Sequence, residues 1–177
     1  MTQRYFTRGF TIALIAVFIA FFFTLFLSAS RSYLLGATPE GIATAENMRQ
    51  TVESQRQTIT PQDIFINNLL VSSVLFLPLV GLFIFITILL NTGYVLGLLS
   101  TAYNASPLMY VVSIFSVGGW IEMMAYTFLA AENIYILFLV ITQSGAAERL
   151  KNHSWKTALI YITLLLVGAV WEGLLLA

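Results

Sequence analysis

The sequence of 177 residues contains no cysteine and a single histidine, His153. Without cysteine, the chain has no disulfide, no thiolate metal site, no covalent haem attachment and no cysteine nucleophile. One histidine excludes multi-histidine metal or haem ligation within this chain. We therefore expect no cofactor and no metal site.

Charged side chains are also scarce, at 9% of the residues against about 25% in a soluble domain. The net charge is zero and no basic cluster is present, so nothing in the charge pattern indicates a nucleic-acid partner. What the chain has instead is a hydrophobic content of 59%, arranged in long runs. The runs do not alternate apolar and polar residues as transmembrane β-strands do. The sequence therefore predicts an all-α, polytopic transmembrane helical bundle.

The first apolar run covers residues 10–30, which is long enough to cross a bilayer as a helix. Arg4 and Arg8 precede it and favour a cytoplasmic N-terminus. The alternative is a signal peptide, because Ser28-Ala29-Ser30 resembles a small-residue cleavage site. We take residues 1–30 as a cytoplasmic N-terminus followed by an uncleaved transmembrane helix in the plasma membrane.

Residues 31–63 form the only sizeable polar segment and are expected outside the cell. Thr38-Pro39-Glu40 is typical of a helix start, with Thr as the cap and Pro in the first turn. Apolar residues then recur at helical spacing, at Ile42, Ala45, Met48 and Val52. The pattern predicts an extracytoplasmic amphipathic helix on the bilayer or on the bundle, with a solvated connector as the alternative.

Residues 64–177 are expected to form the main transmembrane bundle. A second helix start, at Thr60-Pro61-Gln62-Asp63, has the residues of a capping box. The apolar run that follows is too long for one crossing, and Pro78 and Gly81 favour a break, which gives helices at 64–79 and 81–101.

A further helix is predicted at 107–131, and Glu132-Asn133 is interpreted as the turn that ends it. The last span is predicted at 159–177. The basic stretch 148–156 is expected in the cytoplasm. An even number of crossings must then precede it, so residues 132–147 are expected as a re-entrant or surface piece. This gives five spans; six result if 132–147 also crosses.

Glu122 is the main candidate for a functional residue. Residues 64–121 carry no charged side chain, and Glu122 follows them inside a run that stays apolar to Ala131. An acid at membrane depth is costly and marks a site by default. It could relay protons or bind a cation; alternatively, it is a protonated carboxyl that ties helices together. Candidate hydrogen-bond partners are Asn67, Asn68, Asn91 and Tyr94. No Lys or Arg lies in the predicted spans, so no intrachain ion pair is expected at that depth.

Other candidates are an acid near the C-terminus and several small residues. Glu172 is either a second intramembrane polar site or a solvated terminal acid. Gly93 and Gly97 have the GxxxG spacing that lets helices approach closely, within the chain or across a dimer. Gly118 and Gly119 lie one turn before Glu122. The predicted helix-packing residues are Gly93, Gly97, Gly118, Gly119 and Ala125.

Several short motifs in residues 61–177 resemble the stage II sporulation protein M family of integral membrane proteins. The family pattern of an apolar segment ending in Asn matches Phe65-Ile66-Asn67-Asn68, and its Asn-Gly-x-x-x-Gly matches at Gly93 and Gly97, with Thr92 in place of Asn. Its His-Gly-x-x-Glu-x-x-Ala matches at Gly119, Glu122 and Ala125, with Gly118 in place of His. The acid of its last helix corresponds to Glu172. The missing His weakens any role that needs a His–Glu pair. Bacterial members of the family look like membrane partners of cell-wall hydrolases.

Two functions follow as expectations. The first is a non-catalytic membrane scaffold or assembly subunit, present as a homo-oligomer or within a membrane complex, with segment 31–63 and the cytoplasmic loop as docking surfaces. The second is a permease-like component of a transporter that works with a separate ATPase, since the chain has no Walker A motif. The sequence disfavours an intramembrane enzyme, because no His or Lys in a predicted span could activate a serine.

Overall fold

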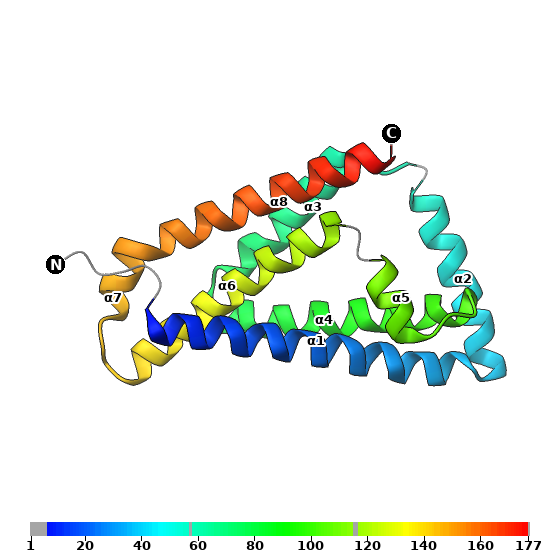
Figure 1. The fold of residues 1–177 in the computed structure, drawn as a ribbon, viewed down its shortest axis with the longest axis horizontal. Coiled ribbons are helices and arrows are strands. Elements are labelled where there is room, and N and C mark those ends of the chain that lie inside the picture. The colour runs from blue at the N-terminus through cyan, green and yellow to red at the C-terminus, as the bar shows by residue number, and fades with distance from the viewer. Residues whose placement is uncertain (1–6, 57, 115–116, 177) are drawn as a thin grey trace.

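The computed structural model describes residues 7–56, 58–114 and 117–176, and the secondary structure of these residues is entirely helical (Figure 1). The elements are α1 (Arg8–Gly36), α2 (Pro39–Arg56), α3 (Pro61–Leu75), α4 (Pro78–Ala102), α5 (Pro107–Ile114), α6 (Val117–Ile141), α7 (Ala146–Arg149), a π-helical turn (Leu150–Ser154) and α8 (Trp155–Leu176). The all-α prediction is confirmed.

Four helical stretches among the described residues are long and apolar enough to cross a membrane. They are Arg8–Gly36, Pro78–Ala102, Gly118–Ile141 and the continuous stretch Ala146–Trp171. Their outer surfaces are rich in exposed large apolar side chains, such as Ile19, Phe83 and Leu166. In a bilayer such surfaces face lipid. The chain is therefore a membrane protein.

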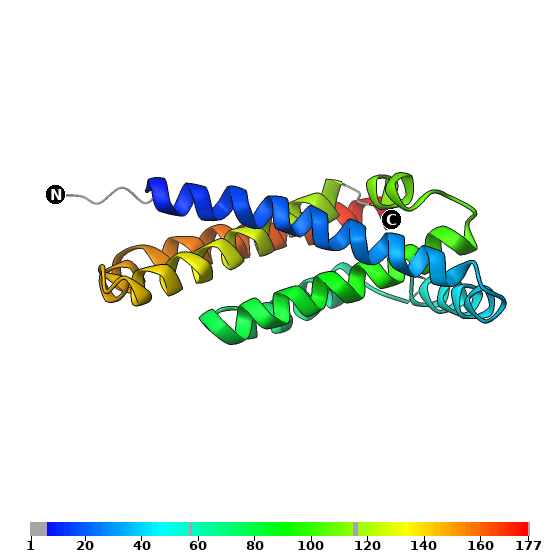
Figure 2. The same cartoon turned by 90° about the horizontal axis from the view of Figure 1, so that it is seen from below.

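The α1 and α4 helices run in the same direction and pack closely along much of their length (Figures 1 and 2). Ser28 Oγ donates a 2.7 Å hydrogen bond to the carbonyl oxygen of Leu90, and farther along Gly36 lies against Thr101. A Cβ on Gly93 would lie 2.7 Å from the Leu25 carbonyl oxygen, and one on Gly97 would clash with Ser32 and with the α1 backbone. Small residues therefore let the two helix backbones meet, as GxxxG spacing does in membranes.

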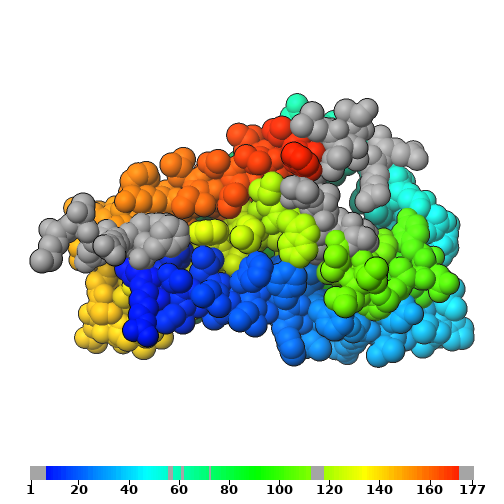
Figure 3. All heavy atoms as spheres, in the orientation of Figure 1, coloured from blue at the N-terminus to red at the C-terminus, as the bar shows by residue number. Residues whose placement is uncertain are grey.

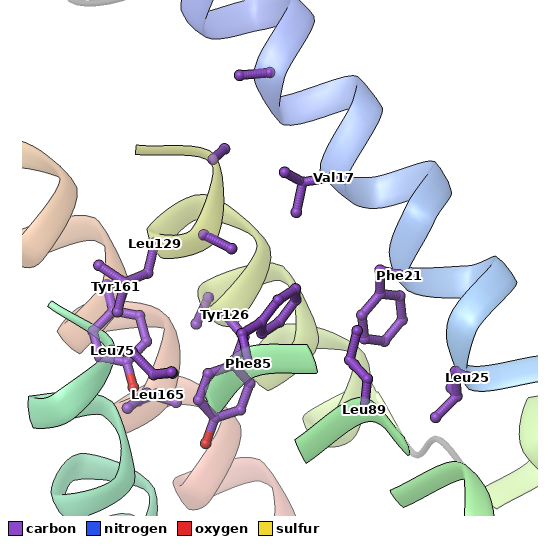
Figure 4. Close-up of a cluster of buried hydrophobic side chains, with 14 of the residues drawn as sticks. Val17, Phe21, Leu25, Leu75, Phe85, Leu89, Tyr126, Leu129, Tyr161 and Leu165 are labelled. Atoms are coloured by element: carbon purple, nitrogen blue, oxygen red, sulfur yellow. The ribbon is translucent and has the colours of Figure 1, made fainter. Parts of the chain in front are cut away.

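The α6 helix lies between the α1–α4 pair and the α3–α8 pair and contacts all four helices. Figure 3 shows atoms of α6, in yellow-green, between those of α1 in blue and α8 in orange and red. Figure 4 shows the apolar core that results, with Phe21 and Leu25 of α1 opposite Phe85 and Leu89 of α4. On the other side, Leu129 of α6 packs near Tyr161 and Leu165 of α8 and Leu75 of α3 (Figure 4). The α2 helix crosses the far ends of α1 and α4.

Proline and capping residues set several helix boundaries as the sequence indicated. Thr60 accepts a hydrogen bond from the Asp63 backbone N–H while the Asp63 carboxylate accepts one from the Thr60 N–H, so the capping box is confirmed. The break between 64–79 and 81–101 is confirmed, although it falls at Phe76–Leu77, with Pro78 in the first turn of α4.

Four predictions about the second half of the chain are wrong. The helix expected at 107–131 is two helices, since α5 ends at Ile114 and α6 begins at Val117. Glu132 and Asn133 do not form a turn, because α6 continues through them to Ile141. Residues 132–147 are therefore no separate piece, and the loop expected at 148–156 is helical and leads into α8. The physical reason is that Glu132 and Asn133 find partners on other elements, so they do not have to face water.

Candidate functional site

The Glu122 carboxylate lies where α3, α6 and α8 meet. The side-chain amide of Asn68 on α3 donates a 2.7 Å hydrogen bond to Glu122 Oε1. Both side chains are half-buried. On the α8 side the carboxylate faces Gly168, where an added Cβ would lie 2.8 Å from Glu122 Cγ and 3.2 Å from the Gly118 carbonyl oxygen. Gly168 thus leaves the room that the acid occupies.

Two tyrosines lie close to this junction. The Tyr161 hydroxyl lies 3.5 Å from the Asn68 carbonyl oxygen, and the Tyr126 and Tyr161 ring centroids are 6.1 Å apart. Tyr161 is fully buried and Tyr126 nearly so. An amide donor of α3 therefore binds the Glu122 carboxyl of α6, and such a hydrogen bond between helices favours their association.

The other predicted residues are distributed over the bundle. The side chains of Asn67, Asn91 and Tyr94 are exposed on α3 and α4, away from the buried core. Gly118 and Ala125 are buried on α6 and Gly119 is half-buried beside them. Glu172 lies in α8, but its side chain is outside the described ones. Of the four predicted partners of Glu122, the structure brings Asn68 to it.

Sequence analysis missed a buried ion pair between α6 and α7. The guanidinium of Arg149 donates to both Glu132 oxygens, with Nε–Oε1 at 2.9 Å and Nη2–Oε2 at 2.5 Å. The two side chains are 4% and 3% exposed. Ser154 Oγ donates a third hydrogen bond to Glu132, at 2.8 Å. Such bidentate geometry is the strongest form of a carboxylate–guanidinium pair.

Aromatic rings complete the surroundings of Arg149. Its guanidinium carbon lies 4.8 Å from the Phe10 ring centroid and 5.1 Å from that of Tyr135. The Tyr135 hydroxyl accepts a 2.9 Å hydrogen bond from Thr7, just before α1. The ion pair therefore joins α6 and α7 to the start of α1. A sequence signal existed, since Glu132 interrupts an otherwise apolar stretch, but the interpretation of this residue as part of a turn concealed it.

A second polar contact of α6 was also missed. Asn133, which is buried, donates a 2.6 Å hydrogen bond from its side-chain amide to the carbonyl oxygen of Leu75, the last residue of α3. This carbonyl has no partner within its own helix because the helix ends there. Asn133 thus caps α3 from a neighbouring helix.

The α2 helix carries its own charge network at the opposite end of the molecule. Arg49 pairs with Glu46 and Glu53, and the Tyr103 hydroxyl also donates to Glu53 at 2.8 Å. The hydrogen bonds from Arg49, and secondarily from Gln50, lower the pKa of Glu46 to about 2. The bond from Tyr103 is the main cause of a lowered pKa at Glu53. The network fixes α2 to the end of α4.

The described cavities are not lined by the two acids of α6, Glu122 and Glu132. One of about 400 Å³ lies among α1, α2 and α4 and is lined by Tyr33, Glu46 and Asn104, among others. Another, of about 370 Å³, is an apolar groove between α1 and α6, lined by Ile12 and Phe138 among others. Neither includes Glu122 or Glu132 in its lining. Within the described residues no group of three or more His, Cys, Asp and Glu side chains could hold a metal ion.

No protein-family model, curated protein or solved structure matches the chain. The resemblance to the stage II sporulation protein M family therefore stays a prediction based on short motifs.

Proposed function

We propose that the chain is a non-catalytic integral membrane subunit that organises partner proteins in the cell envelope. The observation that carries this proposal is that two acids of α6, Glu122 and Glu132, bind polar groups of other helices. Glu122 is hydrogen-bonded to Asn68, and Glu132 is paired with Arg149, so both carboxylates connect helices. Neither lines a described cavity in which a substrate could bind.

In the proposed orientation the bundle lies in the plasma membrane and the N-terminus is in the cytoplasm. Five helices alternate in direction along the bundle, namely α1, α3, α4, α6 and α8 (Figure 1). The basic residues Arg8, Lys151 and Lys156 gather at one end, which favours that end as cytoplasmic. The α2 helix then lies on the outer surface.

The outward side of α2 is the proposed docking surface for a partner. The side chains of Asn47, Gln50, Thr51 and Ser54 are exposed there, whereas Glu46 and Glu53 are paired with Arg49. Uncharged polar groups on a fixed helix can make hydrogen bonds to a second protein without separating a charge pair. A second copy of the chain or another envelope protein would fit this surface.

The test is extraction from the native membrane in a mild detergent, followed by native electrophoresis and mass spectrometry. We expect a complex larger than the 19.7 kDa chain. Lysine substitutions at Asn47, Thr51 and Ser54 should release the partner, while lysine substitutions at Gln143 and Ser144 on the opposite end should not. Release only by the second set would place the dock on the α6–α7 loop, and a monomeric wild-type chain would contradict the scaffold.

A permease-like subunit is the second candidate. The specific observation in its favour is that α5 ends at Ile114 and α6 begins at Val117, so that Glu122 lies in the first two turns of a helix. Interrupted helices with an acid nearby are common in transporters. Co-purification of an ATPase, together with loss of transport in Glu122→Gln, would favour this candidate over the scaffold.

A further inference from the structure

The turn between α3 and α4 carries no polar side chain. Phe76 and Leu77 connect the helices, and Pro78, Leu79 and Val80 begin α4. Leu77 is 55% exposed and Leu79 is 71% exposed. A cytoplasmic turn normally carries basic residues, and water would be a poor environment for such a surface. We call residues 76–80 the hairpin tip.

The hairpin tip stops short of the end of α1. Phe21 stacks on Phe85 with ring centroids 6.4 Å apart, and Ser28 bonds to the carbonyl of Leu90. In these parallel helices Pro78 therefore lies beside the second turn of α1, about six residues, or roughly 9 Å, past its start at Arg8. Figure 2 shows the first turn of α4 withdrawn from the end at which α1 and α7 lie.

The hairpin tip also stops short of the end of α6. The bond from Asn133 to the Leu75 carbonyl fixes the level of the tip on α6. Beyond Asn133, α6 continues for about eight more residues, roughly 12 Å, to Ile141. Phe138 is 55% exposed and Ile141 is 80% exposed in this extension. Apolar side chains so exposed need hydrocarbon around them, so the bilayer continues past the tip.

Several backbone groups of the turn have hydrogen-bond partners within the protein, which a bilayer favours. Asn133 bonds to the Leu75 carbonyl, the Leu77 N–H donates to the Val74 carbonyl at 3.2 Å, and the Gly81 N–H donates to the Leu77 carbonyl at 2.6 Å. Pro78 has no N–H to satisfy. Gly81 is necessary for this tight turn, because a Cβ there would collide with the Leu75 carbonyl.

We propose that α3 and α4 form a re-entrant hairpin whose tip contacts lipid acyl chains of the cytoplasmic leaflet and does not reach the cytoplasm. The five segments keep their alternating directions, but α3 and α4 meet inside the bilayer. The helices α1 and α6 and the α7–α8 stretch then cross completely. The inference rests on the proposed orientation and is independent of the scaffold role.

The absence of cysteine makes a direct test available, because each introduced thiol is the only one in the chain. Three variants are labelled with a membrane-impermeant maleimide on the cytoplasmic and outer faces of native membranes: Leu77→Cys at the tip, Ser144→Cys between α6 and α7, and Thr58→Cys between α2 and α3. Leu79→Cys repeats the tip measurement. All four side chains are exposed in the structure, so the protein itself does not shield them.

We expect Ser144→Cys to react from the cytoplasmic face and Thr58→Cys from the outer face. Leu77→Cys and Leu79→Cys should react at least about 100-fold more slowly from either face, because a thiol in hydrocarbon does not form the reactive thiolate. All should react fully in SDS. A nitroxide at the tip should be more accessible to oxygen than to a water-soluble nickel chelate.

Reaction of both tip variants from the cytoplasmic face at a rate comparable with that of Ser144→Cys would overturn the re-entrant hairpin. Exchange of the reactive faces of Ser144→Cys and Thr58→Cys would overturn the orientation and, with it, the assignment of the tip to the cytoplasmic leaflet. Neither result would bear on partner binding by α2, so the scaffold role is tested separately.

Discussion

Replacement of Arg149 by methionine should be among the most destabilising single changes in this protein. The substitution removes the positive charge but keeps much of the length and apolar volume of the side chain. Glu132, which is 2% exposed, would then hold a buried carboxylate with the Ser154 hydroxyl as the remaining partner from this cluster. Removal of one member of a buried pair typically costs about 3–5 kcal/mol, since the other charge is left uncompensated.

The geometry puts the expected loss toward the upper part of that range. Arg149 makes two short hydrogen bonds to Glu132 and lies over two aromatic rings, and the substitution removes all of these contacts. A loss of about 4 kcal/mol reduces the folding equilibrium constant by about three orders of magnitude. By contrast, the double variant Glu132→Leu, Arg149→Met leaves no buried charge, and we expect it to lie within about 1 kcal/mol of the native protein.

The assay is reversible unfolding in mixed micelles with increasing SDS, followed by tryptophan fluorescence. Lys151→Met is the matched control, because Lys151 is an exposed cation in the adjoining π-helical turn. A double-mutant cycle isolates the coupling between Glu132 and Arg149. If Arg149→Met unfolded like Lys151→Met, or if the double variant were as unstable as the single one, the buried pair would not have the structural role assigned to it.

Three further predictions concern other parts of the bundle. Glu122→Gln should change the free energy of unfolding by less than about 1 kcal/mol, because the amide still accepts the hydrogen bond from Asn68. Glu122→Leu should lower the free energy of unfolding by about 0.6–2 kcal/mol in the same titration. Equal losses in the two variants would contradict the hydrogen-bond role. Gly97→Leu should destabilise the chain by about 1–3 kcal/mol or more, because the larger side chain forces α4 away from α1. The midpoint of SDS unfolding should fall and the size-exclusion peak should broaden. An unchanged unfolding midpoint would contradict the close contact. The bond from Arg49 lowers the pKa of Glu46 from 4.5 to about 2, so its stabilisation of α2 is complete above about pH 4.5 and is lost as the pH falls toward 2. Amide exchange in α2, corrected for intrinsic rates, should therefore be faster at pH 3 than at pH 6, and Arg49→Gln should reduce this difference; equal protection at both values would contradict the network.

Local rules were sufficient for much of the architecture. The apolar runs placed α1, α4 and the α8 region, and the capping box at Thr60 and Asp63 located the start of α3. Pro78 and Gly81 indicated the turn between α3 and α4. These features depend on neighbours within a few residues, so a single sequence contains the information needed to find them.

The polar residues of α6 show where local rules fail. Glu132 and Asn133 have the composition of a helix end, yet the helix continues, because one side chain meets Arg149 and the other meets the end of α3. The partners are about 17 and 58 residues away along the chain, beyond any helical periodicity. The pattern records that a residue is polar, but tertiary contact decides whether water or protein satisfies it.

Asn68 was predicted as one of four partners of Glu122, and the contact between α3 and α6 selects it. Asn67 is its neighbour in sequence but points to the surface, because adjacent residues on a helix lie about 100° apart. The phase of α3 relative to α6 thus decides which of the two amides reaches the acid. The sequence alone indicated that an amide side chain could bind Glu122, but not which face of α3 turns toward α6.

Two kinds of helix contact divide the bundle. The α1–α4 contact depends on small residues, of which Gly93 and Gly97 admit the α1 backbone. The contacts of α6 with α3 and α7 depend on polar groups, through Glu122, Glu132 and Asn133. Because lipid tails are as apolar as leucine, hydrophobicity alone does not select partners among membrane helices. Close backbone packing therefore makes α4 the partner of α1, whereas hydrogen bonds make α3 and α7 partners of α6. The polar groups of α6 determine its partners although the rest of its surface is largely apolar.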